Sequence, residues 1–414
     1  MQKKNLFITF PVDAGMKASE KYYQNIFSEN FNFESFSYKS NTNDTYNEYI
    51  RKKRYRFLAS FKLKRKIKEY SQQKKLIIFH GLSPMIYTYG SYNFTNTILS
   101  LDATRSLPDF VLRNKLKKDF AYHVHKFILK RVSKVLCWTD PVAEMVNTFY
   151  NIPNKNIFKV PAPFEASTFK MLPRETPKKP NVLFIGREFD RKGGDVLIKK
   201  LDKLLNNCSL TMVTNDKRAN IKNVKYFDAK LNRDQIIDLY RSHDILLLPT
   251  KFDPYGLVLA EAAAAGLAVI TTKFALGSKD AITNNVTGFI AETQEKCVDL
   301  AIDLIKDHKK IDAFKAASYS KIQQSLTETK IYEEYIDKIK YHKSSDKNRY
   351  LLDLVNSYDG TSGSMLELKA RLQKLVELPI SDKRLRSKFT QRKSIYRDKK
   401  RTRRKLKRPE RGVY

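Results

Sequence analysis

Short apolar runs alternate with helix-like stretches along most of the chain. Leu6–Phe10 has the composition of a first β-strand, and Ile245–Pro249 opens with four apolar residues that suit a strand buried on both faces of a sheet. Strands that alternate with helices are typical of a parallel α/β sheet. The same pattern predicts strands at Leu76–Phe79, Thr97–Leu101, Val135–Trp138, Asn181–Ile185, Ser209–Thr214 and Ala268–Thr272, and helices at Tyr122–Val132, Gly194–Asn206, Arg233–Ser242, Pro254–Ala265 and Cys297–Asp307.

A proline-rich segment separates two such series of elements. Five prolines fall between residues 161 and 180, with charged residues and few long apolar runs between them, which is typical of a linker. We therefore predict an α/β protein with two doubly wound, Rossmann-like domains that face each other across a cleft. The predicted parts are a first domain at 1–165, a linker at 166–180, a second domain at 181–325, a helix at 326–343 that returns to the first domain, a short helical extension at 344–380 and a basic tail at 381–414.

The length and composition exclude several classes of protein. The chain has 414 residues, 42% hydrophobic and 30% charged, so it is not wholly disordered and is long enough for about two domains. Its three cysteines lie far apart, which argues against a disulfide scaffold or a zinc cluster. No apolar run approaches the ~20 residues that span a bilayer, and the one after Met1 is too short for a signal peptide. These features predict a cytoplasmic protein.

The formal net charge is +35, and many of the cations gather in two places. Arg51–Lys68 has ten Lys or Arg and no acid, and residues 383–411 have 16 against two acids. Cations at this density bind the phosphates of nucleic acid, anionic lipid or nucleotides. The first stretch is either an amphipathic helix on an anionic membrane surface or a domain helix with a solvated face. For the tail, which we expect to be disordered, membrane binding, nucleic-acid binding and simple solvation stay open.

The first stretch that carries chemistry is a strand-to-helix turn. Gly186 ends the predicted strand, Arg187 and Lys192 lie in the turn, and Gly193 precedes the helix. Helix N-termini bind anions through free N–H groups and the helix dipole, and the two cations add formal charge at the same place. The turn is therefore either a diphosphate site or a βα turn with surface cations.

The second stretch, Phe252–Gly266, carries two acids in apolar surroundings. Pro254 suits the first position of a helix, which makes Asp253 a natural N-cap. Glu261 then lies eight residues beyond Asp253, about 12 Å along the helix axis. A carboxylate among apolar residues is costly to bury without a partner. Either Asp253 is only a cap and Glu261 a solvated exception, or the two acids hold two hydroxylated parts of one ligand.

Together the two stretches resemble the C-terminal, nucleotide-sugar-binding domain of the family 4 retaining glycosyltransferases, which belong to the glycosyl transferases group 1 and have the GT-B architecture. The Gly-Arg…Lys-Gly turn of that family matches at positions 186, 187, 192 and 193, and its acid-x7-acid motif matches at Asp253 and Glu261. Leu239–Thr250 and Ala268–Gly288 match as well, so the resemblance covers roughly residues 180–295. In the first half, Leu99–Thr104 resembles a segment of some members.

The resemblance implies a donor site in the second domain. Between Gly186 and Gly193, the side chains of Arg187 and Lys192 would hold the diphosphate of a nucleotide sugar. Because the sequence has no Asp-x-Asp pair, a metal-bridged diphosphate is not implied, and no metal or other cofactor is expected. The two cations would supply the electrostatic stabilisation that a metal gives elsewhere.

The resemblance also implies roles for the second motif. Glu261 would accept hydrogen bonds from the ribose hydroxyls, and Asp253 from the hydroxyls of the transferred sugar. The backbone amides of Gly256 and Leu257 would face the sugar and the phosphates. The chain departs from the family pattern in ways that bear on the donor's sugar and base: the first acid is usually Glu, the usual Gly-Gly pair is Leu276-Gly277, and a common glycine is Asp228.

In the first domain, acceptor-side candidates follow the predicted strands, where open α/β sheets bind ligands. They are Gly15, His80, Asp102 and Arg105. Asp102 is also a candidate catalytic acid, together with Asp253 and Glu261 of the second domain. The alternative for each is a turn former at a strand end.

The leading interpretation is a metal-independent, hexosyltransferase-like retaining enzyme. It would move a sugar from a nucleotide-diphosphate sugar to a lipid-linked or polysaccharide acceptor (a glycan or glycolipid), as a peripheral protein on the inner membrane face. One alternative is a glycosyltransferase that modifies DNA or another polyanion gripped by the tail. Another is a non-catalytic protein that binds nucleic acid or membrane on a degenerate transferase scaffold, against which the joint presence of Arg187, Lys192, Asp253 and Glu261 argues.

Overall fold

A computed structural model gives the fold and describes residues 4–10, 21–25, 27–28, 31–37, 62–73, 75–94, 97–104, 106–114, 118–172, 174–327, 330 and 333. By its internal contacts the chain divides into residues 1–351 and 352–414, and every described residue belongs to the first unit. Gly15, Arg105, the extension at 344–380 and the tail at 381–414 lie outside the described residues, as does most of 326–343.

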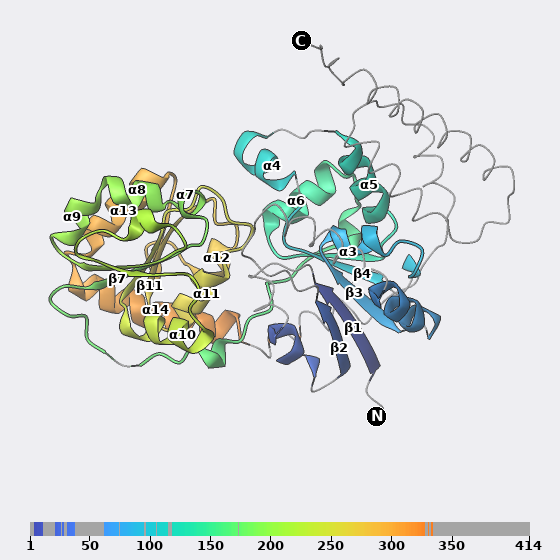
Figure 1. The fold of residues 1–414 in the computed structure, drawn as a ribbon, viewed down its shortest axis with the longest axis horizontal. Helices are drawn as coiled ribbons and strands as arrows, with labels where there is room; N and C mark the ends of the chain where they lie inside the picture. The colour runs from blue at the N-terminus through green and yellow to red at the C-terminus, as the bar shows by residue number, and fades with distance from the viewer. Residues whose placement is uncertain are drawn as a thin grey trace, which may run out of the picture. The chain divides into compact units, whose positions relative to one another are not determined.

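The first half of the chain contains a six-stranded parallel sheet in the order β2-β1-β3-β4-β5-β6 (Figure 1). Its strands are β1 (Lys4–Phe10), β2 (Phe31–Ser37), β3 (Leu76–His80), β4 (Thr97–Leu101), β5 (Lys134–Cys137) and β6 (Ile157–Lys159). β4 has its predicted bounds, and β3 and β5 differ from theirs by single residues. β2 and β6 were not predicted.

The second half contains another six-stranded parallel sheet, in the order β12-β11-β10-β7-β8-β9. Its strands are β7 (Asn181–Ile185), β8 (Ser209–Val213), β9 (Val224–Phe227), β10 (Ile245–Leu248), β11 (Ala268–Thr272) and β12 (Gly288–Ala291). Two parallel sheets with intervening helices confirm the predicted α/β class.

Helices cover both sheets. Those of the first half are α3 (Leu82–Tyr87), α4 (Leu107–Arg113), α5 (Phe120–Leu129) and α6 (Asp140–Thr148). Those of the second half are α7 (Phe189–Lys192), α8 (Gly194–Lys199), α9 (Leu201–Leu205), α10 (Arg233–Ser242), α11 (Leu257–Ala264), α12 (Ser278–Ala281), α13 (Gln294–Leu304) and α14 (His308–Ser325). Figure 1 shows α8, α9 and α13 on one face of the second sheet and α10, α11 and α14 on the other.

One predicted helix of the second half is divided. Gly194–Asn206 forms two helices, α8 and α9, because Lys200 between them has φ −114° and ψ 17°, outside the helical range.

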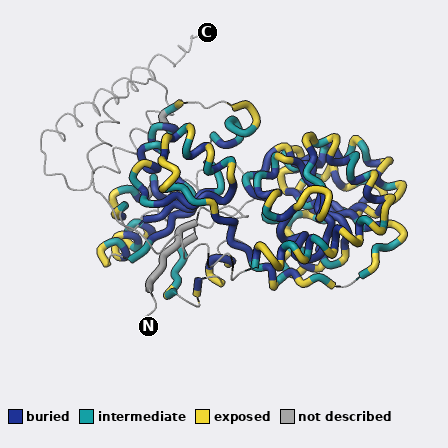
Figure 2. Tube along the Cα trace, turned by 180° about the vertical axis from the view of Figure 1, so that it is seen from behind, coloured by how far each residue is buried: buried dark blue, intermediate teal, exposed yellow. Residues whose placement is uncertain are grey.

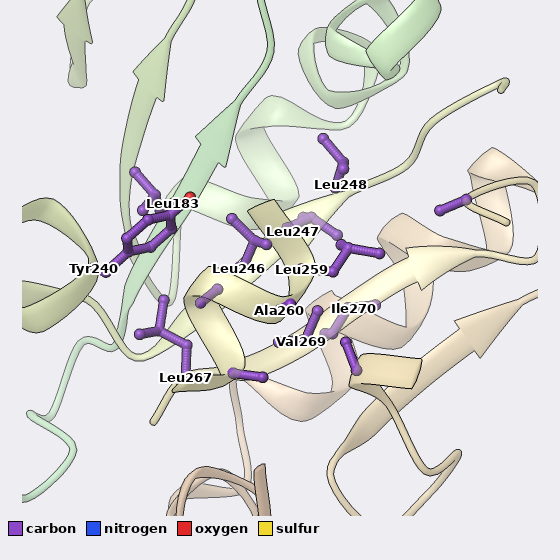
Figure 3. Packing of buried hydrophobic residues seen from close by; sticks show 14 of the residues in the cluster. Leu183, Tyr240, Leu246, Leu247, Leu248, Leu259, Ala260, Leu267, Val269 and Ile270 are labelled. Carbon is purple, nitrogen blue, oxygen red and sulfur yellow. The ribbon is translucent and has the colours of Figure 1, made fainter. Parts of the chain in front are cut away.

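The strands of the second sheet form its core. Every residue of β10 and β11 is buried, as their continuous apolar sequences predict for a sheet covered on both faces (Figure 2). Leu259 and Ala260 of α11 pack among these strand residues (Figure 3). The helix that carries Glu261 is therefore anchored in a close-packed interior, which makes the position of that carboxylate well defined.

The described part of the first basic stretch belongs to a helix at residues 62–72. Leu63, Ile67 and Tyr70 on one side of this helix are buried in the protein, and Lys62 and Lys68 are exposed. The apolar face is thus occupied by the protein's own core, so only the cations of this helix are available to an anionic surface. Among the described residues, no helix has the length and apolar character needed to cross a membrane.

Candidate functional site

The topology of the second sheet brings two loops together. The chain runs from β7 through β8 and β9 toward one edge, then returns to β10 beside β7 and continues to the other edge. The loops that follow β7 and β10 therefore flank the point where the strand order reverses, which is where open α/β sheets bind ligands. The first loop carries Gly186–Lys192, and the second carries Phe252–Gly256.

An ion pair joins the two loops. Nζ of Lys192 donates to Oδ2 of Asp253, 61 residues away in sequence, and the two side chains are 13% and 10% exposed. Lys192 lies over Gly186, where an added Cβ would be 2.7 Å from Cβ of Lys192. Beside this pair, Nη1 of Arg191 donates to the carbonyl of Phe252 at 2.5 Å. The cation predicted to hold phosphate and the acid predicted to hold sugar thus neutralise each other.

Glycine is required where the loops approach most closely. Gly193 has φ +86°, and an added Cβ would lie 1.9 Å from the carbonyl oxygen of Pro249 after β10. A side chain here would drive the two loops apart and with them Lys192 and Asp253. Arg187, the other predicted phosphate ligand, lies in the bend after β7 and is exposed.

The predicted start of the helix at Pro254 was wrong. α11 begins at Leu257, because Gly256 before it has φ +84° in the left-handed region. Residues 253–255 instead bond to a neighbouring loop: the amide of Asp253 donates to the carbonyl of Phe274 at 2.9 Å, and the amide of Leu276 donates back to the carbonyl of Asp253 at 3.0 Å. Asp253 is therefore not an N-cap, and its carboxylate is directed to Lys192.

Glu261 is buried and each of its oxygens accepts a hydrogen bond, so the interpretation of this acid as a solvated exception was wrong. Because α11 begins at Leu257, Glu261 lies four residues, or about 6 Å, along the helix axis from its first residue. The expected 12 Å assumed that the helix began directly after Asp253. Oε1 accepts from the hydroxyl of Tyr22 at 3.0 Å, and Oε2 accepts from the hydroxyl of Tyr240 at 2.9 Å. Burial raises the pKa of Glu261, although the two hydroxyl donors and the nearby Arg233 oppose that shift.

Arg233, from the start of α10, completes this cluster. Its guanidinium lies over the ring of Tyr22, 5.0 Å from the centroid, and its Nη2 donates to the Tyr22 hydroxyl at 2.9 Å. Tyr22, Arg233 and Tyr240 were not predicted as site residues. The sequence pattern could have identified Tyr240 as a buried residue, since α10 was predicted correctly and Tyr240 lies on its apolar side. Nothing in the sequence connects Tyr22 with a residue 239 positions away.

The carboxyl edge of the first sheet has a different composition. His80, the last residue of β3, is fully buried, and its Nδ1 lies 3.2 Å from Oγ of Ser100 in β4. The same Oγ accepts from Nε1 of Trp138 at 3.2 Å and lies 2.9 Å from the hydroxyl of Tyr23. Burial lowers the pKa of His80 to about 3, so its ring is neutral at pH 7.

Asp102 follows β4 and is the other described acceptor-side candidate. Its side chain is 29% exposed, and its Oδ1 accepts from the amide of Ala103 at 2.7 Å. Nε2 of His80 lies 3.7 Å from that oxygen, which with a neutral ring is no ion pair. The structure thus places His80 and Asp102 together. Of the described residues, none group as three or more His, Cys, Asp or Glu able to hold a metal ion.

One aromatic contact connects this edge with the loop that carries Asp253. The ring of Trp138, which follows β5, meets the ring of Tyr255 edge-on at a centroid distance of 5.7 Å. Both side chains are buried.

Comparison with known proteins supports the resemblance. Residues 172–321 match the family model described as glycosyl transferases group 1. Over 119 residues the chain is 29% identical to an uncharacterized glycosyltransferase of Methanocaldococcus jannaschii, a match that covers 26% of this chain and 30% of that one. The chain spans less than half the length of the curated relatives to which it was matched.

Solved structures extend the likeness to most of the chain. Sucrose-phosphate synthase of Thermosynechococcus elongatus superposes with a TM-score of 0.64 at 14% identity, over 81% of this chain and 98% of that one. An Anabaena protein, Alr3699/HepE, in complex with UDP and glucose, superposes with a TM-score of 0.62 at 13% identity, over 81% and 99%. At such identities the likeness concerns the fold alone. The resemblance to group 1 glycosyltransferases is therefore confirmed over residues 172–321, on a fold of the GT-B type.

Proposed function

We propose that the chain is a retaining glycosyltransferase that uses a nucleotide-diphosphate sugar as donor. The observation that carries the proposal is the pairing of Lys192 with Asp253 at the point where the strand order reverses. A cation and an acid whose side chains bond to each other, with Arg191 and Glu188 nearby, can exchange partners for a ligand that offers both an anion and hydroxyl groups. A sugar diphosphate is such a ligand.

In this proposal the two partners separate when the donor binds. Lys192, together with Arg187, holds the diphosphate and stabilises the negative charge that grows on it as the bond to the sugar breaks. Asp253 accepts hydrogen bonds from the hydroxyls of the transferred sugar, which orients the reacting carbon. Gly256 and Leu257 present backbone amides beside Asp253, and Glu261 accepts from the ribose.

We further propose that transfer needs no metal ion, because Lys192 and Arg187 supply the positive charge at the diphosphate. Transfer should then be unchanged by EDTA. Activity that EDTA abolishes and magnesium or manganese restores would contradict this part of the proposal.

A thermal-shift screen of UDP, GDP and ADP sugars tests donor binding. A ligand that binds only the folded protein stabilises it by RT ln(1 + [L]/Kd), about 2.7 kcal/mol at a concentration of 100 Kd. UDP-glucose is a rational first choice, because Alr3699/HepE was solved with that compound. Stabilisation by one donor and not by the others supports an enzyme, whereas no stabilisation by any donor supports a non-catalytic scaffold.

For the acceptor we propose a lipid-linked or polysaccharide glycan, with the protein peripheral on an anionic membrane surface. The net charge of +35 and the exposed cations of the helix at 62–72 support this choice. The same charge keeps modification of DNA as a second candidate. Sedimentation with anionic liposomes, compared with binding to duplex DNA at equal ionic strength, separates the two.

A further inference from the structure

We infer that Tyr22 is an internal competitor of the donor's ribose: its hydroxyl holds Glu261 in the free protein and has to leave when a nucleotide binds. This inference rests on the proposed function, in which Glu261 accepts from the ribose hydroxyls. What it adds is a residue that determines how tightly, and for which nucleotides, the ribose site binds.

The geometry around Glu261 imitates a bound diol. Two hydroxyl donors, at 3.0 and 2.9 Å, each reach a different oxygen of one carboxylate. Neighbouring hydroxyls of a ribose would present their donors to a carboxylate in the same one-to-one way. Tyr22 and Tyr240 are completely buried, and Glu261 is 9% exposed. An external hydroxyl therefore has little access to Glu261 while both side chains stay in place.

Tyr240 is poorly placed to move. It belongs to α10, within the second sheet's own layers, and lies in the core together with residues of β7, β10 and β11 (Figure 3). Its ring also meets the ring of Phe169 edge-on at 5.8 Å. Withdrawing it would leave a cavity among fully buried side chains, which is costly.

Tyr22 is equally buried, but it comes from outside the layers of the second sheet. It lies in a helical stretch at 21–25 and reaches Glu261 from a position 239 residues away in sequence. The ring meets Phe164 edge-on at 5.8 Å and lies under the guanidinium of Arg233. Because Arg233 belongs to α10 rather than to the helical stretch of Tyr22, it stays beside Glu261 as a counter-charge when Tyr22 leaves.

The consequence is that the free protein binds the nucleotide more weakly than it would without the Tyr22 hydroxyl. The apparent dissociation constant equals the intrinsic one divided by the fraction of molecules in which Tyr22 has left Glu261. A ribose diol recovers the lost hydrogen bonds by replacing the Tyr22 hydroxyl. A nucleotide without ribose hydroxyls has no group to replace it and binds with Tyr22 in place, so Tyr22 weakens the binding of ribonucleotides alone and narrows their advantage over dideoxynucleotides.

The test is calorimetric titration of the full chain with UDP and with 2′,3′-dideoxyuridine diphosphate. Tyr22→Phe keeps the ring contacts and removes the competing hydroxyl, and it should bind UDP roughly tenfold more tightly, because a hydrogen bond to a charged group has been removed from the free state. Its affinity for the dideoxy compound should be unchanged. Tyr240→Phe, the matched control, removes the other hydroxyl on Glu261 and should not tighten UDP binding.

Equal or weaker UDP binding by Tyr22→Phe would overturn the inference, and so would an equal gain for both compounds, which indicates general loosening. Phe164→Leu, which loosens Tyr22 without touching Glu261, should shift UDP affinity in the same direction and replaces Tyr22→Phe if that variant does not fold.

If GDP or ADP is the nucleotide bound, the same pair of compounds is made from that base. Should the unmodified chain bind none of the three diphosphates, the proposed function fails and the inference falls with it; binding without the Tyr22 effect defeats the inference alone.

Discussion

The carboxyl edges of the two parallel sheets contain polar residues of opposite kinds. At the edge of the second sheet, Lys192 and Asp253 are charged, come from different loops and are each about a tenth exposed. At the edge of the first sheet, His80, Ser100 and Trp138 are neutral and buried, with Ser100 bonded to the other two, and the acid Asp102 lies beside His80 with 29% of its side chain exposed. The same sheet architecture therefore supports an ion pair whose members can change partners at the edge of the second sheet, and a buried network of neutral groups at the edge of the first.

The difference indicates which edge can respond to a charged ligand. An ion pair near the surface loses little when a phosphate or hydroxyl replaces one partner, because its members stay paired with charge or dipole. A buried neutral network offers no such exchange, and leaving one of its members without a partner costs about 1–3 kcal/mol. His80, with its pKa lowered to about 3 by burial, also cannot serve as a proton donor at neutral pH. We therefore expect the second edge to bind and react, and the first to position.

The largest expected effect is on turnover at the second edge. Asp253→Asn keeps the shape of the side chain but removes the charge that holds the sugar hydroxyls, so kcat should fall about 100-fold, equivalent to about 2.7 kcal/mol. Glu261→Gln, which acts at the ribose, should chiefly raise the KM for the donor. Steady-state kinetics of both variants provide the measurement, and the same kinetic defect in both would show that the two acids do not divide the work.

Next in size is the loss of donor affinity when the cations are removed. Lys192→Ala and Arg187→Ala should each weaken donor binding by about 1.5–3 kcal/mol, since each removes a charge-assisted hydrogen bond to the diphosphate. Lys192→Ala should also lower the thermal stability, because it leaves the carboxylate of Asp253 without its partner; Arg187 is exposed and should leave stability unchanged. Calorimetric titration with a nucleotide diphosphate, with melting temperatures as the control, decides this. Unaltered affinity in both folded variants removes the diphosphate assignment from this edge.

The contrast between the edges could be predicted from the sequence only in part. β4 and β10 were located because their apolar runs are long enough to define buried strands. Gly193, Asp253 and Glu261 were singled out by their local sequence and by motifs that resemble those of a known family. The unpredicted β2 carries its own signal, since Phe31 and Phe33 alternate with Asn32 and Glu34 along an edge strand, as a half-buried strand requires.

Other features are set by contacts distant in sequence. Asp253 followed by Pro254 is a good local start for a helix, yet backbone bonds to the loop at 274–277 hold that segment in another conformation and delay α11 to Leu257. Local propensity is worth about 1 kcal/mol at such a position, less than the bonds that override it. The partners of Glu261 are a stronger case, because Tyr22 reaches it only once the chain has folded.

At the first edge a smaller effect is expected, on stability rather than on turnover. Because the folded pKa of His80, about 3, lies below its unfolded value near 6.5, the unfolded chain binds the extra proton between these pH values. The contribution of the neutral ring is therefore complete above pH 6.5 and is lost as the pH falls toward 3, by about 2 kcal/mol at pH 5. Urea unfolding from pH 7 to 4 should show this slope in the unaltered chain and a shallower one in His80→Gln. Equal slopes would mean that His80 is already protonated in the folded protein and that the first edge is not a neutral network.

The smallest effect on either edge should come from deleting residues 381–414. This segment has few apolar residues, so little core stability can depend on it, and hydrolysis of the donor in solution should be nearly unchanged. The deletion should instead weaken attachment to anionic liposomes, since each Lys or Arg near such a surface contributes about 1 kcal/mol that salt screens. The exposed cations of the helix at 62–72 should leave residual binding.

If the partner is duplex DNA, the deletion should reduce the slope of affinity against salt concentration, because fewer counterions are released. Binding of both forms to liposomes and DNA over a salt series distinguishes these outcomes. A truncated chain that unfolds would show that the tail supports the core, and one that binds both surfaces as the full chain does would show that the tail binds neither.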